Sequence, residues 1–149
     1  MNQEIFPPKG FVSYEYEREF LYTAGEIDSV WKRLQRRETF TKGQIFPYQV
    51  EFVADSQEGE FLSGELNTHH GPLLSVHGVI GEVTSDYRDL QYFYGSYVLS
   101  FRLVRPVRLE FFRDGNRLKL KLRSYIRPWF LPFWRFGNFM LWSSFRLTL

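Results

Sequence analysis

Apolar and polar side chains alternate near the start of the chain, over residues 11–22. One side of the segment carries Val12, Tyr14, Tyr16, Phe20 and Tyr22, and the other carries Ser13, Glu15, Glu17 and Glu19. A period of two residues with many β-favouring aromatics predicts a strand that is buried on one face only. Arg18 is the exception, because it interrupts the apolar side.

The period changes in the next segment, residues 25–40. Ile27, Val30, Trp31 and Leu34 follow one another at i, i+3, i+4 and i+7, which predicts one stripe of an amphipathic helix. Acidic residues come first in this segment and basic residues last, the order that the helix dipole favours. Its charges therefore need no binding role.

Most of the chain after residue 49 has the pattern of β-strands. We expect six of them, over residues 49–55, 59–69, 73–83, 89–101, 105–112 and 116–126. The turns between them are short, and Asp114-Gly115 is the strongest hairpin signal. Pro106 must lie at a strand start, at an edge or at a bulge, because it has no N–H for the ladder. Successive strands with short turns predict an antiparallel meander.

The final segment, residues 127–149, is apolar on nearly every side. Pro132 is tolerated in a first turn, so we expect a helix from about Leu131 to Phe145. Its most hydrophobic region, residues 129–142, is too short and too polar to span a bilayer of about 30 Å. A helix that is apolar all round is either buried or rests on a membrane.

This order of elements resembles the START/Bet v 1-like (SRPBCC, helix-grip) superfamily over nearly the whole chain. The likeness is carried by the first strand, by the helix with its Val30-Trp31 pair, by the meander and by the aromatic terminal helix. It implies one α+β domain over residues 1–149. In that domain a curved antiparallel sheet of six to seven strands has an N-terminal helical segment, and a C-terminal helix lies over its concave face.

Charge is unevenly spread along the chain, although the total is only +2. Residues 1–99 have a net charge of −7 and residues 100–149 a net charge of +9. In the superfamily the first and last strands are antiparallel neighbours, which would set Glu15, Glu17 and Glu19 against Arg117, Lys119, Lys121 and Arg123. Opposite charges that face each other across two strands stabilise the pair. We therefore expect the two ends to neutralise each other and do not expect nucleic acid as a partner.

Aromatic residues make up 19% of the chain. Large, stiff rings either pack against one another or leave gaps between them. The resemblance implies a cavity for hydrophobic ligands under the terminal helix. We expect the inward rings to be those of Tyr14, Tyr16, Trp31, Tyr92, Tyr94, Tyr97, Phe101, Trp134 and Phe139. Tight mutual packing without a cavity is the alternative.

Three functions fit this pattern. The first is binding of a hydrophobic or aromatic small molecule or a lipid. The second is a cyclase, hydratase or isomerase reaction, of the kind known in the superfamily, that uses His77 or a buried carboxylate, Glu65 or Glu82. The third is contact with a membrane or a protein through the terminal helix. Its aromatic residues and flanking bases suit a lipid interface, namely Trp129, Phe130, Phe133, Trp134 and Trp142 with Arg127 and Arg135.

Other chemistry has no support in the sequence. The chain has no Cys, which excludes disulfides and favours a cytoplasmic location, and the N-terminus has no export signal. His69, His70 and His77 match no metal-ligand spacing, and no phosphate-binding glycine loop or nucleophile elbow is present. We therefore expect no metal and no cofactor, and the pattern leaves the oligomeric state open.

Overall fold

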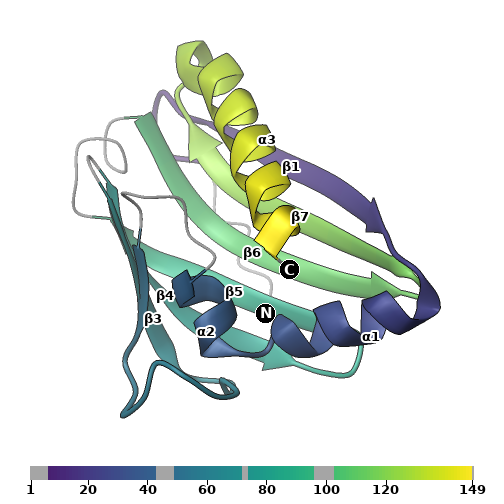
Figure 1. The fold of residues 1–149 in the computed structure, drawn as a ribbon. Coiled ribbons are helices and arrows are strands. Elements are labelled where there is room, and N and C mark those ends of the chain that lie inside the picture. The colour runs from purple at the N-terminus through teal and green to yellow at the C-terminus, as the bar shows by residue number, and fades with distance from the viewer. Residues whose placement is uncertain (1–6, 43–48, 72–73, 96–102, 149) are drawn as a thin grey trace.

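The computed structural model describes residues 7–42, 49–71, 74–95 and 103–148. Seven strands form a single sheet in this part of the chain, in the order β1-β7-β6-β5-β4-β3-β2, and all neighbours are antiparallel. The strands are β1 (Val12–Leu21), β2 (Gln49–Phe52), β3 (Leu66–Gly71), β4 (Leu74–Val83), β5 (Tyr87–Gly95), β6 (Val104–Asp114) and β7 (Arg117–Ile126). Strands β2 to β7 are the predicted meander, and β1 joins it beside β7 (Figure 1).

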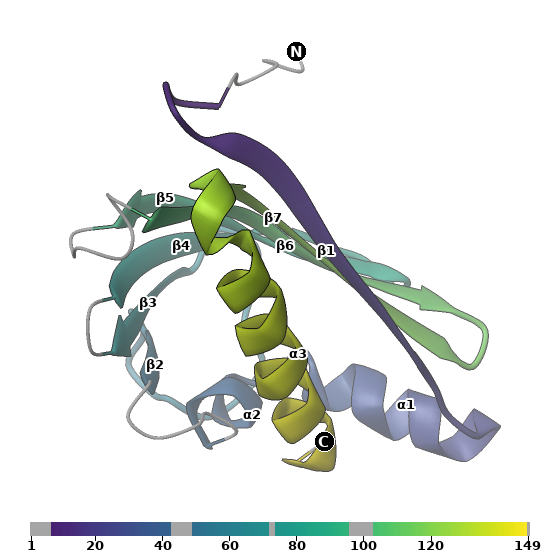
Figure 2. The same ribbon diagram turned by 90° about the horizontal axis from the view of Figure 1, so that it is seen from above.

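The helices lie on one side of this sheet. They are α1 (Ala24–Arg33), α2 (Arg37–Lys42), the short 3-10 helix η2 (Pro128–Phe130) and α3 (Leu131–Thr148). The sheet is curved, α3 crosses its concave side, and α1 and α2 lie at one end (Figure 2). The predicted α+β architecture is confirmed. Among the described helices, none is both long enough and apolar enough to cross a membrane.

The outer face of β1 and β7 carries the predicted charge pairs. The register sets acids against bases: Glu15 opposite Arg123, Glu17 opposite Lys121, and Glu19 opposite Lys119. The ammonium Nζ of Lys121 lies 3.2 Å from Glu17 Oε1. The two ends of the chain therefore neutralise each other here, as expected, because their strands are neighbours.

The helix predicted over residues 25–40 is two helices. The first begins with a capping box, in which Thr23 Oγ1 accepts a hydrogen bond from the Glu26 N–H and the Glu26 carboxylate accepts one from the Thr23 N–H. After Leu34 the backbone pairs with a distant segment. The Phe61 N–H donates to Gln35 O at 2.9 Å. This pairing interrupts the helix, and a search for apolar spacing within residues 25–40 cannot detect it.

Two further strand boundaries differ from the prediction. The strand expected over residues 59–69 begins only at Leu66. Gly59 and Gly64 precede it with φ angles of 99° and 89°, a left-handed backbone that does not continue a strand. The strand expected over residues 49–55 ends at Phe52. The strand expected to reach residue 101 is described only as far as Gly95.

The β6–β7 hairpin confirms two local predictions. Asp114 is paired with Arg117, and Gly115 in the turn between them has a φ of 57°. Pro106 lies at a register shift between Pro106 and Arg108, where a strand tolerates a missing N–H. The hairpin therefore fixes the register that sends alternate side chains of β6 and β7 to the concave face.

Candidate ligand-binding cavity

A cavity of about 390 Å³ lies between the concave face of the sheet and α3. Most of its wall is aromatic or aliphatic. Leu109 and Phe111 of β6 and Leu122 of β7 line it from the sheet, and Trp142 and Phe145 line it from α3. Its volume is in the range of sites that hold small molecules. The alternative of rings packed without a gap is therefore not what the structure shows.

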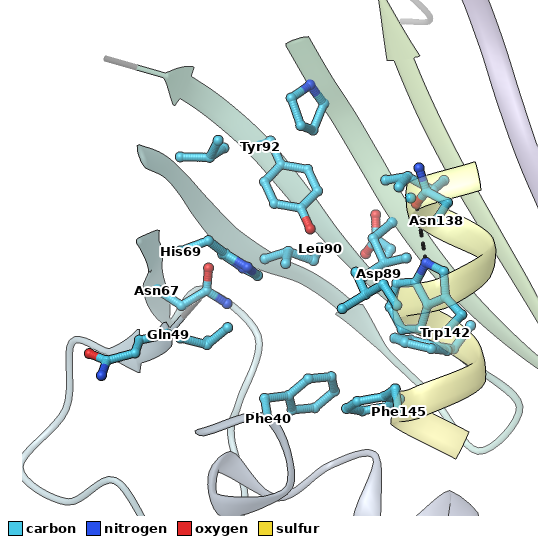
Figure 3. Close-up of a pocket in the computed structure, with 18 of the residues that line it drawn as sticks. Phe40, Gln49, Asn67, His69, Asp89, Leu90, Tyr92, Asn138, Trp142 and Phe145 are labelled. Atoms are coloured by element: carbon cyan, nitrogen blue, oxygen red, sulfur yellow. Dashed lines mark hydrogen bonds between the residues drawn. The ribbon is translucent and has the colours of Figure 1, made fainter. Parts of the chain in front are cut away.

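The inward face of α3 is ordered by an asparagine. Asn138 is buried, its Nδ2 donates to Trp134 O at 2.9 Å, and its Oδ1 accepts a hydrogen bond from Trp142 Nε1 at 3.3 Å (Figure 3). Both ends of the amide are used within the helix. Asn138 therefore fixes the orientation of Trp142 in the cavity wall.

Arg18 holds α3 to β1. Its Nη1 donates to Phe139 O at 3.0 Å and to Ser143 Oγ at 2.7 Å. Its guanidinium also lies 4.7 Å from the centre of the Phe139 ring and 4.9 Å from that of Phe20. The one polar residue on the apolar side of β1 thus binds the helix that covers the cavity.

Arg88 closes the α1 end of the cavity. Its guanidinium stacks 4.1 Å from the centre of the Trp31 ring and donates to Trp31 O and, at 3.2 Å, to Gln35 Oε1. Burial lowers the pKa of Arg88 to about 10, because the charged form loses water. The guanidinium remains charged at neutral pH and serves to bind α1 to the sheet.

The polar side chains of the wall gather on β3 and β5. Figure 3 shows Asn67, His69 and Tyr92 on one side of the cavity, away from Trp142 and Phe145. The rings of His69 and Tyr92 meet edge to face at 5.4 Å. Burial raises the pKa of Tyr92, so its hydroxyl is neutral over the physiological range. Asn67, His69 and Tyr92 therefore form a polar group on one side of the cavity.

Asp89 also contributes to the wall, but its carboxylate is occupied. Oδ2 accepts hydrogen bonds from Arg108 Nε at 2.8 Å and Gln91 Nε2 at 3.2 Å, and Oδ1 accepts one from the Glu82 N–H. It packs against Gly81, where a Cβ would lie 2.2 Å from Oδ1. These contacts make Asp89 a structural group of the sheet.

The structure places two of the predicted ligand-binding rings in the cavity wall and three in the core or against it. Tyr92 and Trp134 line it. Tyr16 and Trp31 belong to the surrounding buried core, and Tyr14 packs against that core. A role in binding stays a prediction for all five.

The other four rings do not add to the wall that is described. Phe139 is 52% exposed, because its position on α3 faces β1 and Arg18 instead of the cavity. The side chain of Tyr94 lies outside the described residues, as do Tyr97 and Phe101. Their inward orientation stays a prediction.

The three predicted catalytic candidates are not brought together. Glu65 accepts hydrogen bonds from Arg37 at 2.5 and 3.1 Å, and these bonds raise the pKa of Arg37. Glu82 is exposed. His77 is half-buried on β4, opposite Thr68, and does not belong to the cavity wall. In the described part of the chain, no three His, Asp or Glu residues are placed to hold a metal ion.

Asn67 and His69 are two polar wall residues that the sequence pattern did not assign to the cavity. In the sequence Asn67 and His69 fall on the same side of a strand as Glu65. Three polar residues at alternate positions are typical of the face of a strand that is exposed to solvent. A signal was present in the partner strand, since Asn67 is paired with Gly78. A glycine inside a strand often marks a close approach by a neighbouring group.

Solved structures show the same arrangement of sheet and helices. Ginseng major latex-like protein 151 from Panax ginseng matches with a TM-score of 0.61 at 10% identity, over 91% of this chain and 94% of that chain. Norcoclaurine synthase from Thalictrum flavum, in complex with dopamine and hydroxybenzaldehyde, matches with a TM-score of 0.59 at 12% identity, over 93% and 87%. No family model matches the sequence, and no curated protein does. The chain therefore has the helix-grip fold of Bet v 1-like proteins, as the resemblance implied.

Proposed function

We propose that this protein binds a hydrophobic or aromatic small molecule, or a lipid, in the cavity under α3. The observation that carries the proposal is the cavity itself, which encloses about 390 Å³ within a largely aromatic and aliphatic wall. An apolar ligand gains free energy by leaving water for such a wall. The structure of norcoclaurine synthase, which has the same fold and was solved in complex with dopamine and hydroxybenzaldehyde, supports the proposal.

A fluorescence titration tests the proposal. N-phenyl-1-naphthylamine is uncharged and becomes bright in apolar surroundings, so we expect saturable binding to the purified protein. Leu109→Trp places a ring in the cavity and should abolish binding. Leu62→Trp adds the same ring at a site that is 63% exposed and should not. Native mass spectrometry of the untreated protein provides an independent measurement of any co-purified ligand.

The proposal fails if the probe binds equally well to the wild type and to Leu109→Trp, provided that circular dichroism shows both proteins to be folded. Binding would then occur outside the cavity. The enzyme hypothesis receives no comparable support, because Glu65, Glu82 and His77 do not converge on the cavity.

A second function, contact with an anionic lipid surface, is favoured by the outer face of α3. Phe133 and Phe136 are 64% and 66% exposed, and Phe139, Met140 and the preceding Trp129 are at least half exposed. Large apolar side chains are rarely grouped on a surface that meets only water. Residues 127–149 contain three arginines and no acidic residue. Aromatic and basic side chains without acids suit an anionic interface.

The position of the cavity supports this choice of surface. Phe133 and Met140 are exposed and also line the cavity, so its rim lies on the same face of α3. A lipophilic ligand that left a bilayer at this face would reach the cavity without crossing water. A cytoplasmic location, which the Cys-free sequence favours, would present this face to an anionic leaflet.

Liposome flotation tests the contact. We expect the protein to float with vesicles that contain phosphatidylserine and much less with pure phosphatidylcholine. Phe133→Ser and Phe136→Ser together should abolish flotation, whereas Leu62→Ser should not. Light scattering provides the alternative outcome. If the wild type is a dimer that does not float, and the double variant is a monomer, the exposed face of α3 binds a second copy of the chain and the lipid proposal is contradicted.

A further inference from the structure

Asn67 is a buried polar group inside an apolar cavity. It is 2% exposed, and its Oδ1 accepts no hydrogen bond from any described residue. Native proteins rarely leave a buried amide oxygen without a donor, because the group has lost its bonds to water. A molecule that enters the cavity can supply the donor that Asn67 lacks among the described residues.

The sheet leaves room for this orientation of Asn67. The paired residue on β4 is Gly78, and a Cβ on Gly78 would lie 2.8 Å from Asn67 Oδ1 and 2.8 Å from Leu90 Cδ1. Any side chain at position 78 would displace both groups. The amide is thus set into a gap that only glycine provides.

Tyr92 supplies a second polar group on the same side of the cavity. Its ring meets that of His69 at 5.4 Å, and Figure 3 shows its hydroxyl pointing into the space between β3 and α3. A neutral phenol donates one hydrogen bond and accepts another. On this side of the cavity Asn67 therefore offers an acceptor, and Tyr92 offers both a donor and an acceptor.

Two charged side chains of the described wall are already bonded within the protein. Among the described lining residues, the carboxylate of Asp89 is bonded to Arg108, and the guanidinium of Arg88 is stacked on Trp31 and bonded to Gln35. A charged ligand group would lose its water without gaining an opposite charge from Asp89 or Arg88. The chemistry of this side of the cavity thus favours an uncharged group.

From these contacts we infer that the cavity selects an uncharged lipophilic molecule with a hydroxyl group, a phenol or an alcohol. The hydroxyl donates to Asn67 Oδ1 and is bonded by Tyr92, while the rest of the molecule occupies the space beside Trp142 and Phe145. The inference rests on the proposed ligand binding and narrows its ligand class.

Four related probes separate the contributions of shape, hydrogen bonding and charge. They are 2-naphthol, 2-methoxynaphthalene, naphthalene and 2-naphthoate, each measured by displacement of N-phenyl-1-naphthylamine. We expect 2-naphthol to bind about tenfold more tightly than 2-methoxynaphthalene, which has no donor for Asn67. We expect 2-naphthoate to bind most weakly.

Two variants of the polar side and one control complete the experiment. Asn67→Leu should weaken 2-naphthol about tenfold and leave 2-methoxynaphthalene within about twofold. Tyr92→Phe should also weaken the binding of 2-naphthol. Because it keeps the aromatic ring, it serves as the test variant if Asn67→Leu folds poorly. Gln49→Leu removes an exposed amide from the rim of the same cavity and should leave the ratio unchanged.

The possible failures are distinguishable. If neither the fluorescent probe nor any naphthalene derivative binds, ligand binding in the cavity is wrong and the inference falls with it. If the probes bind but 2-naphthol has no advantage, or keeps its advantage in both Asn67→Leu and Tyr92→Phe, only the inference is overturned. An Asn67 that is bonded to water alone would give this second result, and tightest binding of 2-naphthoate would also contradict the inference.

Discussion

Helices α1 and α3 pack on the same concave face of the sheet but use their two sides differently. Both bury an inner stripe, which includes Trp31 on α1 and Trp142 on α3. The outer side of α1 carries exposed charges such as Asp28 and Lys32. The outer side of α3 instead exposes Phe133 and Phe136.

The difference separates a structural helix from a functional one. Against α1 the Arg88 guanidinium stacks on the buried Trp31 ring and closes that end of the cavity. Beneath α3 the same sheet leaves a cavity, and polar contacts from Arg18 hold the helix beside it. Apolar surface on both sides of α3 has two uses under our proposals: the inner side contacts a ligand and the outer side contacts a membrane.

Truncation of the two tryptophans should show this contrast most strongly. Trp31→Ala removes a buried ring and its stack with the Arg88 guanidinium, so we expect a loss of about 3–5 kcal/mol in the free energy of unfolding. Trp142→Ala should cost about 1 kcal/mol less, because one side of its ring already faces the cavity and has fewer contacts to lose. Urea denaturation of both variants measures the two values. Equal costs would mean that α3 is packed as tightly as α1.

Removal of the Arg18 side-chain contacts should loosen α3 alone. We expect Arg18→Met to lower the free energy of unfolding by about 1–2 kcal/mol, because two hydrogen bonds that the charged guanidinium donates are lost. Amide hydrogen exchange should become faster along α3 and remain unchanged in α1. Faster exchange in both helices would show that Arg18 supports the whole fold, and would count against a separate attachment of α3.

Glycine replacements give a smaller effect of opposite sign. A Cβ on Gly137 of α3 meets no atom within 4 Å, and the same is true of Gly25 in α1. Gly137→Ala should therefore raise the free energy of unfolding by about 0.5–1 kcal/mol, because glycine loses the most backbone freedom in a helix. Gly25→Ala, in the first turn, is the matched control and should give a smaller gain. A loss in Gly137→Ala, measured by thermal melting, would mean that the helix needs to flex at this point.

The titration of Tyr92 tests how well α3 excludes water. Its folded pKa is raised above the unfolded value by burial, so the stabilising contribution is fully present below pH 10 and is lost as the pH rises through the folded value. Absorbance at 295 nm should therefore show one fewer late-titrating phenol in Tyr92→Phe. Loss of an early-titrating phenol would show instead that water reaches the cavity under α3.

The sheet was predictable because its signals are local or symmetric. Alternation along residues 11–22 and 116–126 specifies both strands, and the resemblance to the superfamily implied that they pair, which the acids on one and the bases on the other fit. The break after Leu34 was not predictable, since it depends on a backbone bond from Phe61 to Gln35. It arises from tertiary contact and leaves no periodic signal.

The cavity wall was predictable only in part, for a different reason. A helix that is apolar on every side has no hydrophobic stripe to show which side faces inward. Phe139 was therefore assigned to the cavity, although it lies on Arg18. Asn67 was missed because a polar residue in a strand resembles a solvent-facing one until the gap at Gly78 is known.

The pairing of β1 with β7 has a consequence for how the protein folds. The two strands join residues as far apart in sequence as Val12 and Ile126, so this contact carries a large loop-closure cost and is expected to form late. Arg18, which attaches α3, lies on the strand that this step adds. The binding space would then be completed only when the chain ends meet, and a partly folded molecule would have a meander but no enclosed interior for a ligand.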